Sequence, residues 1–282
     1  MTGPASAQDF PVPPRDAATV VLLRDGAEAL ELYLVKRSRA VDFMAGAHVF
    51  PGGRLDEAHD AAPEALARLG VGVEALAARL GETLAPARAA GLFVAAIRET
   101  FEEAGVLFGR LAPGWAAPAA RTALGAGTPF AALVARLDAG ALVPWLRWVT
   151  PQTSPRRFDA RFFLARAPEG EEPQPDGREA VAGLWISPRR ALERWASGEL
   201  QLAPATARSI DALADFGSVE EALVAAAARP PPAAMPIVWR DDDGRTFVSL
   251  PGDPRHPDAD AMGGRIRRVE FAEGRYRPVP AG

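Results

Sequence analysis

The stretch that decides the fold is AAIRETFEEAG, residues 95–105, which places three glutamates inside an apolar run. Each residue of an α-helix advances by about 100°, so Glu99, Glu102 and Glu103 share one face of such a helix. The opposite face is apolar and consists of Val94, Ile97, Phe101 and Ala104. The pattern predicts an amphipathic helix that packs on a sheet and turns a carboxylate cluster the other way. Thr83 or Pro86 is expected to open this helix, and Gly105 to cap its C-terminus.

The carboxylate cluster has two explanations. Like charges one helical turn apart destabilise a helix by about 0.2–0.5 kcal/mol, and only Arg98, at the edge of the stripe, is placed to brace one of them. A solvated helix surface is the ordinary reading of such a cluster. The functional reading is a site for hard divalent cations, which prefer oxygen ligands and neutralise the repulsion. The spacing alone leaves both open.

The residues around the cluster resemble a known motif. RETFEEAGV, residues 98–106, is similar to the second half of the Nudix box, R-E-U-x-E-E-x-G-U, and departs from it only at Thr100. FPGGRLDEAHD, residues 50–60, resembles the first half, with Gly53 as the box glycine. The chain is therefore identified as a member of the Nudix hydrolase family by resemblance.

The box departs from the family pattern in two ways. His59 stands where the box has Glu, although Asp56 and Glu57 lie close by, and residues 60–97 replace a much shorter spacer. Such an interrupted box resembles the coenzyme A diphosphatase-like subgroup, which has a helical insertion inside the motif.

An upstream signature points to the same subgroup. RSRAVDFMAGAHVFPGG, residues 37–53, is similar to the coenzyme A signature R-S-x3-R-x3-G-x3-F-P-G-G. Asp42 replaces the central arginine of that signature, and Arg39 is the candidate substitute.

The resemblance implies a Nudix-type α/β/α sandwich with a mixed sheet. Residues 1–16 are Pro-rich and predict a flexible arm, and residues 17–230 are expected to form the hydrolase domain, with the helical insertion at 60–91. Composition shifts after the proline run at 230–232, so residues 231–282 predict a small β-rich C-terminal extension made of two hairpins.

Local patterns predict the elements of the domain. Residues 18–25 and 30–38 predict a hairpin, and residues 47–53 a short strand that ends in a Pro-Gly-Gly turn. Further strands are expected at 146–151, 157–166 and 181–187. Two short helices are expected within 60–85, and one further helix around 129–138. Another helix is expected after Ser187, which would be its N-cap, and residues 203–228 are expected to be helical throughout.

The resemblance also implies which residues carry the chemistry. Glu99, Glu102 and Glu103 would hold Mg2+ or Mn2+, and Glu102 and Glu103 would take part in catalysis. Arg98 would orient a glutamate. Glu179, in a loop before a predicted strand, is the candidate general base, and a solvated loop glutamate is the alternative.

Six further residues are candidates for substrate binding. Gly52 and Gly53 would bring backbone close to the metal site. Guanidinium groups bind phosphate bidentately, and the candidate arginines are Arg37, Arg39, Arg156 and Arg157.

The expected activity is hydrolysis of a diphosphate in coenzyme A or acyl-CoA, which yields 3',5'-ADP and (acyl-)4'-phosphopantetheine. ADP-ribose, a dinucleotide or a nucleotide sugar is the alternative substrate, and a catalytically silent nucleotide-binding module is the alternative of another class.

The chain has no cysteine and a net charge of −4, which excludes thiol chemistry and a general attraction to nucleic acid. Without a signal peptide or an apolar membrane span, the sequence favours a cytoplasmic protein, and a homodimer is common in the family.

Overall fold

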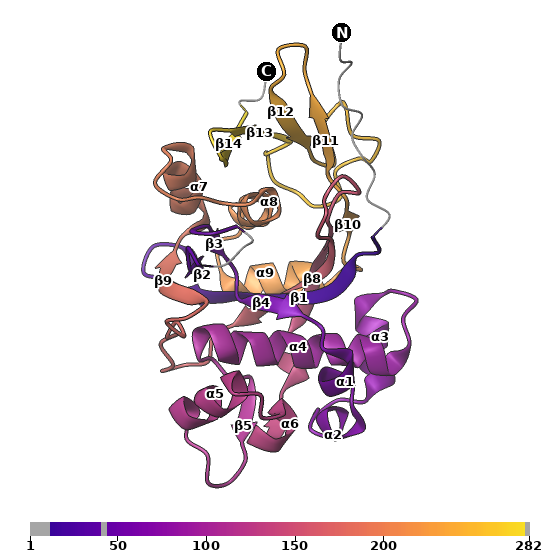
Figure 1. The fold of residues 1–282 in the computed structure, drawn as a ribbon, viewed down its shortest axis with the longest axis vertical. Coiled ribbons are helices and arrows are strands. Elements are labelled where there is room, and N and C mark those ends of the chain that lie inside the picture. The colour runs from indigo at the N-terminus through magenta and orange to yellow at the C-terminus, as the bar shows by residue number, and fades with distance from the viewer. Residues whose placement is uncertain (1–11, 41–43, 280–282) are drawn as a thin grey trace.

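A mixed β-sheet lies between two layers of helices (Figure 1). The computed structural model describes residues 12–40 and 44–279. Asp42 and most of the predicted arm therefore lie outside the described residues. The strand β1 (Arg15–Asp25) begins at Arg15, so the end of the arm predicted at 1–16 belongs to the sheet instead.

The long strand β1 organises the main sheet. It pairs in parallel with β8 (Phe158–Arg166) and antiparallel with β2 (Leu30–Arg37), which confirms the predicted hairpin. Its first half also pairs with β4 (Gly52–Arg54). The sheet is completed by β3 (His48–Val49), β7 (Val143–Val149), β9 (Ala180–Ile186) and β10 (Ala233–Ala234).

Both faces of β1 are buried, which explains its continuous apolar run. Val20 and Leu22 face the layer that contains the carboxylate helix, whereas Val21 and Leu23 face the opposite layer. The two hydrophobic cores are therefore separated by the sheet itself.

The carboxylate helix α4 (Pro86–Ala104) covers one face of the sheet. Pro86 stands in its first turn and Gly105 ends it with φ of +73°, a left-handed conformation that favours glycine. The remaining elements of this layer are α1 (Glu57–Asp60), α2 (Pro63–Leu66), α3 (Val73–Leu80), α5 (Ala117–Gly125), α6 (Phe130–Leu133), the 3-10 turn η1 (Ala139–Ala141) and the small sheet of β5 (Gly109–Leu111) and β6 (Val134–Leu137).

The opposite layer consists of α7 (Pro188–Ala196), α8 (Pro204–Leu213) and α9 (Val219–Ala227). The Ser187 hydroxyl accepts a hydrogen bond from the Arg190 amide, which confirms the predicted N-cap.

Residues 237–278 of the extension form a separate four-stranded antiparallel sheet beside α7 and α8 (Figure 1), whereas β10 pairs with β7 in the main sheet. The two hairpins of the separate sheet confirm the two predicted from the sequence. They are made of β11 (Ile237–Arg240) with β12 (Thr246–Ser249) and β13 (Arg268–Ala272) with β14 (Arg275–Pro278).

Three local predictions were wrong. Residues 47–53 form two short strands, β3 and β4, with Gly52 and Gly53 inside β4 because they pair with Thr19 and Ala18. The predicted helix at 129–138 stops after one turn because residues 134–137 pair with β5 as β6. The helix predicted over 203–228 is broken at 214–218, where the Ser218 hydroxyl caps α9.

In the described ranges, no helix combines the length and the apolar character that crossing a membrane requires.

Candidate active site

The carboxylate of Glu103 lies against the start of β4. Its side chain is buried, with the residue only 4 % exposed, and its Oε2 accepts a hydrogen bond of 3.1 Å from the Gly52 amide. Thr100, the one departure in this half of the box, is also buried, and its hydroxyl donates to the Ala96 carbonyl of its own helix. The polar side chain is therefore satisfied without disturbing the packing of α4.

Gly53 allows β4 to approach Glu99 closely. A Cβ placed on Gly53 would overlap the Glu99 carboxylate, and a Cβ on Gly52 would lie 2.8 Å from Thr19 Cα. Both glycines are thus required by close approach rather than by a tight turn. The structure brings these two residues close to Glu99 and Glu103.

Arg98 is held in a network beside the cluster. Its Nε and Nη2 donate to the two carboxylate oxygens of Asp60 at 2.8 and 2.9 Å, and its Nη1 donates to Glu99 Oε1 at 2.7 Å. Nη2 also donates to the Arg54 carbonyl, and Nη1 lies 3.8 Å from Glu102 Oε2. Burial lowers the pKa of Arg98, but the ion pairs with Asp60 and Glu99 more than offset it, so the pKa is raised. Arg98 is therefore bonded to both Asp60 and Glu99.

The three glutamates have raised pKa values, and the charges of nearby carboxylates add to the effect of burial. Burial is the main cause for each. For Glu103, burial and then the charge of Glu99 raise the pKa to about 8. A cation bound here would displace a proton and relieve the repulsion that holds these values up.

An open pocket of about 500 Å³ adjoins this face of α4. Its acidic side includes Glu99 and Glu102, and its other wall comes from the α5–α6 loop. Its lining comprises Arg54, Leu55, Asp56, Glu57, His59, Arg98, Glu99, Glu102, Leu124, Gly127, Thr128, Pro129 and Phe130.

The donor chemistry of the cluster fits hard divalent cations. Glu103 is buried and Glu99 is half-buried, and the glycines of β4 bring its backbone close to both carboxylates. In the described part of the chain, however, no three Asp, Glu or His side chains converge closely enough to hold an ion as they stand.

Glu179 and Arg37 lie on the carboxylate side of the molecule. The charge of Glu179 raises the pKa of both Glu102 and Glu103, and the charge of Arg37 lowers that of Glu103. Glu179 is exposed in the turn before β9, where its amide donates to Asp176 Oδ2. Arg39 is exposed in the turn after β2, and a Cβ on Gly46 would lie 3.9 Å from its Cγ.

The other two candidate arginines lie in the turn between β7 and β8. Arg157 donates to the carbonyls of Thr150 and Val12, and its Nη2 lies 3.9 Å from Met235 Sδ. Arg156 is exposed beside it. Neither lines the acidic pocket, and these contacts of Arg157 hold the turn to neighbouring backbone.

Two residues of the site were missed by sequence reasoning. Asp60 is only 1 % exposed, and its carboxylate forms the ion pair with Arg98. It directly follows His59, the residue that stands where the motif has Glu. Its place at the end of the first half-box is the signal that could have revealed it. Arg121 donates to the Glu102 carbonyl from α5 at 2.7 Å, and nothing in the local sequence distinguishes it from a surface arginine.

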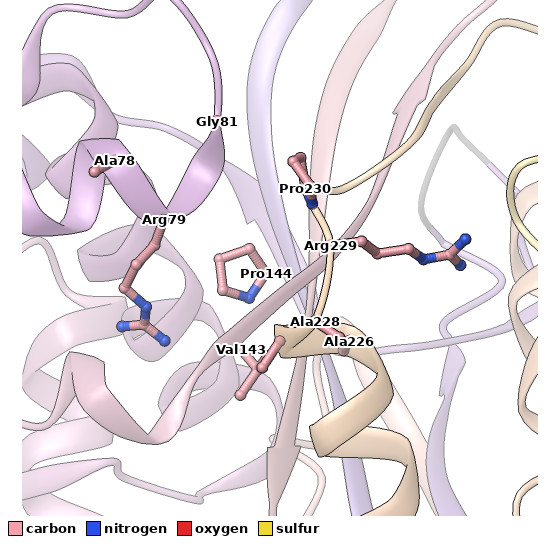
Figure 2. Close-up of a pocket in the computed structure, with 10 residues that line it drawn as sticks. Ala78, Arg79, Gly81, Val143, Pro144, Ala226, Ala228, Arg229 and Pro230 are labelled. Carbon is pink, nitrogen blue, oxygen red and sulfur yellow. The ribbon is translucent and has the colours of Figure 1, made fainter.

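A second cavity, of about 310 Å³, lies between α3, β7 and the end of α9 (Figure 2). None of the box carboxylates lines it, and the Arg79 guanidinium at its edge donates to the carbonyls of Ala139 and Leu142. This second cavity is therefore separate from the acidic pocket beside α4.

Comparisons with known proteins agree with this geometry. The NUDT19 Nudix domain family model matches residues 77–213. The chain is 30 % identical over 272 residues to the human acyl-coenzyme A diphosphatase NUDT19, covering 80 % of this chain and 72 % of that one. The chicken (Gallus gallus) protein of the same name is 32 % identical over 285 residues, covering 81 % and 73 %.

A solved structure shows the same fold. The crystal structure of a NUDIX hydrolase from Alicyclobacillus acidocaldarius is similar with a TM-score of 0.60 and 32 % identity, covering 76 % of this chain and 97 % of that one. Together with the box residues on α4 and β4, these similarities establish that the chain belongs to the Nudix hydrolase family.

Proposed function

We propose that this Nudix diphosphatase is metal-dependent and cleaves the diphosphate of coenzyme A or acyl-CoA to 3',5'-ADP and (acyl-)4'-phosphopantetheine. The observation that carries the proposal is the pair of carboxylates, half-buried Glu99 and buried Glu103, against the glycines of β4. The choice of substrate is supported by the names of the human and chicken relatives and by the upstream signature at residues 37–53.

Glu99, Glu102 and Glu103 would hold Mg2+ or Mn2+. Bound there, the metal would lower the pKa of a water molecule and neutralise charge on the phosphates. Arg98 keeps Glu99 oriented through a 2.7 Å hydrogen bond, and the Gly52 amide does the same for Glu103. Each of these two carboxylates is thus held by one hydrogen-bond donor before substrate binds.

The proposed reaction is a direct displacement. The oxygen of a water molecule bonds to one phosphorus, the bond from that phosphorus to the bridging oxygen breaks, and the bridging oxygen leaves on the second phosphate. Glu179 is proposed to take the proton of the attacking water, because its charge acts on both Glu102 and Glu103. The phosphates would be bound by Arg37 and Arg39 on the β2 side, with Arg156 and Arg157 as weaker candidates.

A substrate panel tests the proposal. The purified protein with Mg2+ or Mn2+ would be offered coenzyme A, acetyl-CoA, ADP-ribose, a dinucleoside polyphosphate and a nucleotide sugar, and products would be separated by chromatography. We expect 3',5'-ADP from the coenzyme A compounds with the largest kcat/KM. Faster cleavage of ADP-ribose or another nucleotide would contradict the substrate, and inertness toward the whole panel would favour a nucleotide-binding module.

A further inference from the structure

His59 is an unexplained feature of the acidic pocket. It occupies the position at which the motif has Glu, yet the carboxylate that pairs with Arg98 comes from Asp60 instead. His59 is therefore not needed for the ion pair that braces Arg98. It lines the same pocket as Glu99 and Glu102.

The ring of His59 is fixed at one nitrogen. Its Nδ1 lies 2.8 Å from Asp56 Oδ2, and this hydrogen bond is the main cause of the lowered pKa of Asp56. The ionised Asp56 carboxylate accepts the Nδ1 proton, so Nε2 is the nitrogen that is left for another partner. The side chains of His59 and Asp56 are 57 % and 52 % exposed, so a ligand in the pocket can reach them.

The pair stands on a rigid base although it is exposed. The Asp56 amide donates to Asp60 Oδ2 at 2.9 Å, and Asp60 is buried against Arg98. The short helix α1 is thereby tied to α4 by a bidentate ion pair. The position of the imidazole is consequently set by the same network that orients Glu99.

An anionic substrate needs positive groups in this pocket. Its charged lining comprises Arg54, Asp56, Glu57, Arg98, Glu99 and Glu102, most of which are acidic. Arg98 is already committed to Asp60 and Glu99. The helices α2 and α6 also pack on α1, but in the described chain they contribute no charged side chain to the lining.

We infer that His59, held at Nδ1 by Asp56, donates a hydrogen bond from Nε2 to a phosphate oxygen of the substrate. The inference rests on the proposed function, and it adds a substrate-binding residue that replaces the usual glutamate of the motif. Donation from Nε2 while Nδ1 stays bound to Asp56 uses both ring nitrogens as donors.

Steady-state kinetics with the preferred substrate of the panel test the inference. His59→Ala is expected to raise KM about ten- to hundredfold while kcat stays within about threefold, because a charge-assisted hydrogen bond is lost. Asp56→Asn is expected to raise KM in the same direction. Glu64→Gln, an exposed carboxylate on α2, is the matched control and should leave both constants unchanged.

One further readout separates this role from a structural one. Calorimetric titration with ADP and Mg2+ measures binding in the absence of turnover. It should show that His59→Ala binds ADP more weakly than the wild-type protein does.

An unchanged KM and ADP affinity in His59→Ala would overturn the inference. A fall in kcat at constant KM would also overturn it, because that result indicates a role in proton transfer. Failure of the proposed function is distinguishable, since it would show as inertness or a different preferred substrate in the wild-type protein. Binding of ADP can be compared between variants in either case.

Discussion

Gly53 illustrates how one missing side chain shapes the site. A methyl group there would overlap the Glu99 carboxylate, which Arg98 and the packing of α4 hold in place. We expect Gly53→Ala to lower kcat about 10²-fold, because a small displacement of a positioned group has effects of that size. Gly72→Ala is the control, since its Cβ would meet only Glu74 Oε2 at 3.9 Å. Equal activity of the two variants would show that the close approach is not required.

His48 makes stability depend on pH. It is buried on β3, its Nδ1 has no hydrogen-bond partner, and burial together with the charges of Lys36 and Arg194 lowers its pKa from 6.5 to about 4. Between these values the unfolded chain binds the proton and the folded chain does not. Stability is therefore full above about pH 6.5 and falls as pH decreases toward 4, by up to ~1.4 kcal/mol per pH unit.

Denaturant unfolding at pH 7.5 and pH 4.5 measures this effect. Wild type should lose about 2 kcal/mol more than His48→Leu between the two pH values. Parallel losses in the two proteins would mean that His48 is not the group responsible.

At the scale of elements, a buried ion network ties the inserted helices to the sheet. Glu82, in the loop between α3 and α4, receives hydrogen bonds of 3.0 and 2.6 Å from Arg161 on β8. Arg161 also pairs with Asp16 on β1, and Arg147 on β7 lies 3.1 Å from Glu82. The Arg161 side chain is only 3 % exposed, so loss of Glu82 removes part of the compensation of a buried charge.

We therefore expect Glu82→Gln to destabilise the fold by about 3 kcal/mol. The exposed pair of Arg190 and Glu193, at 3.4 Å, provides the comparison, and Glu193→Gln should cost less than about 1 kcal/mol. Chemical denaturation of both variants checks the difference. Similar small losses would show that the insertion is not anchored through Glu82.

The elements that could be predicted from the sequence are those with strong local signals. The helix α4 has a proline at its start, a glycine at its end and a regular apolar face, and the β1–β2 hairpin has continuous β-type runs. The helix α5 was missed because its Gly-, Pro- and Ala-rich surroundings resemble a loop. Residues 134–137 were predicted as helix, but their pairing with β5 depends on tertiary contacts.

The same distinction holds within the site. Glu99, Glu102, Glu103 and Arg98 could be placed because they lie on one helix at fixed angles. The contacts of Arg98 with Asp60 and of Arg121 with Glu102 join segments that are distant in the sequence. Spacing along the chain carries no information on such pairs.

For the whole molecule, the C-terminal extension is joined to the hydrolase fold by buried charges. Arg208 on α8 is fully buried and donates to Asp211 and to Asp260 of the extension, at 3.1 and 2.7 Å. Val248 and Leu250 also pack in the core between the sheet and α7–α9.

Removal of residues 231–282 would expose this core and leave Arg208 with one partner fewer. We expect the truncated chain 1–230 to lack a cooperative unfolding transition, as measured by thermal denaturation followed by circular dichroism. A transition within a few degrees of the full-length protein would show that the hydrolase domain folds without residues 231–282.

The central claim is that the carboxylates of α4 hold the metal for diphosphate hydrolysis, and Glu103→Gln tests it most directly. The amide keeps the shape of the side chain and an oxygen for the Gly52 hydrogen bond, but it removes the charge. Coenzyme A hydrolysis would be followed with saturating Mg2+ and with EDTA, together with calorimetric Mn2+ binding. The account predicts no wild-type activity in EDTA, and in Glu103→Gln a loss of kcat of at least about 10²-fold with weaker Mn2+ binding. Activity in EDTA, or wild-type turnover by Glu103→Gln, would contradict it.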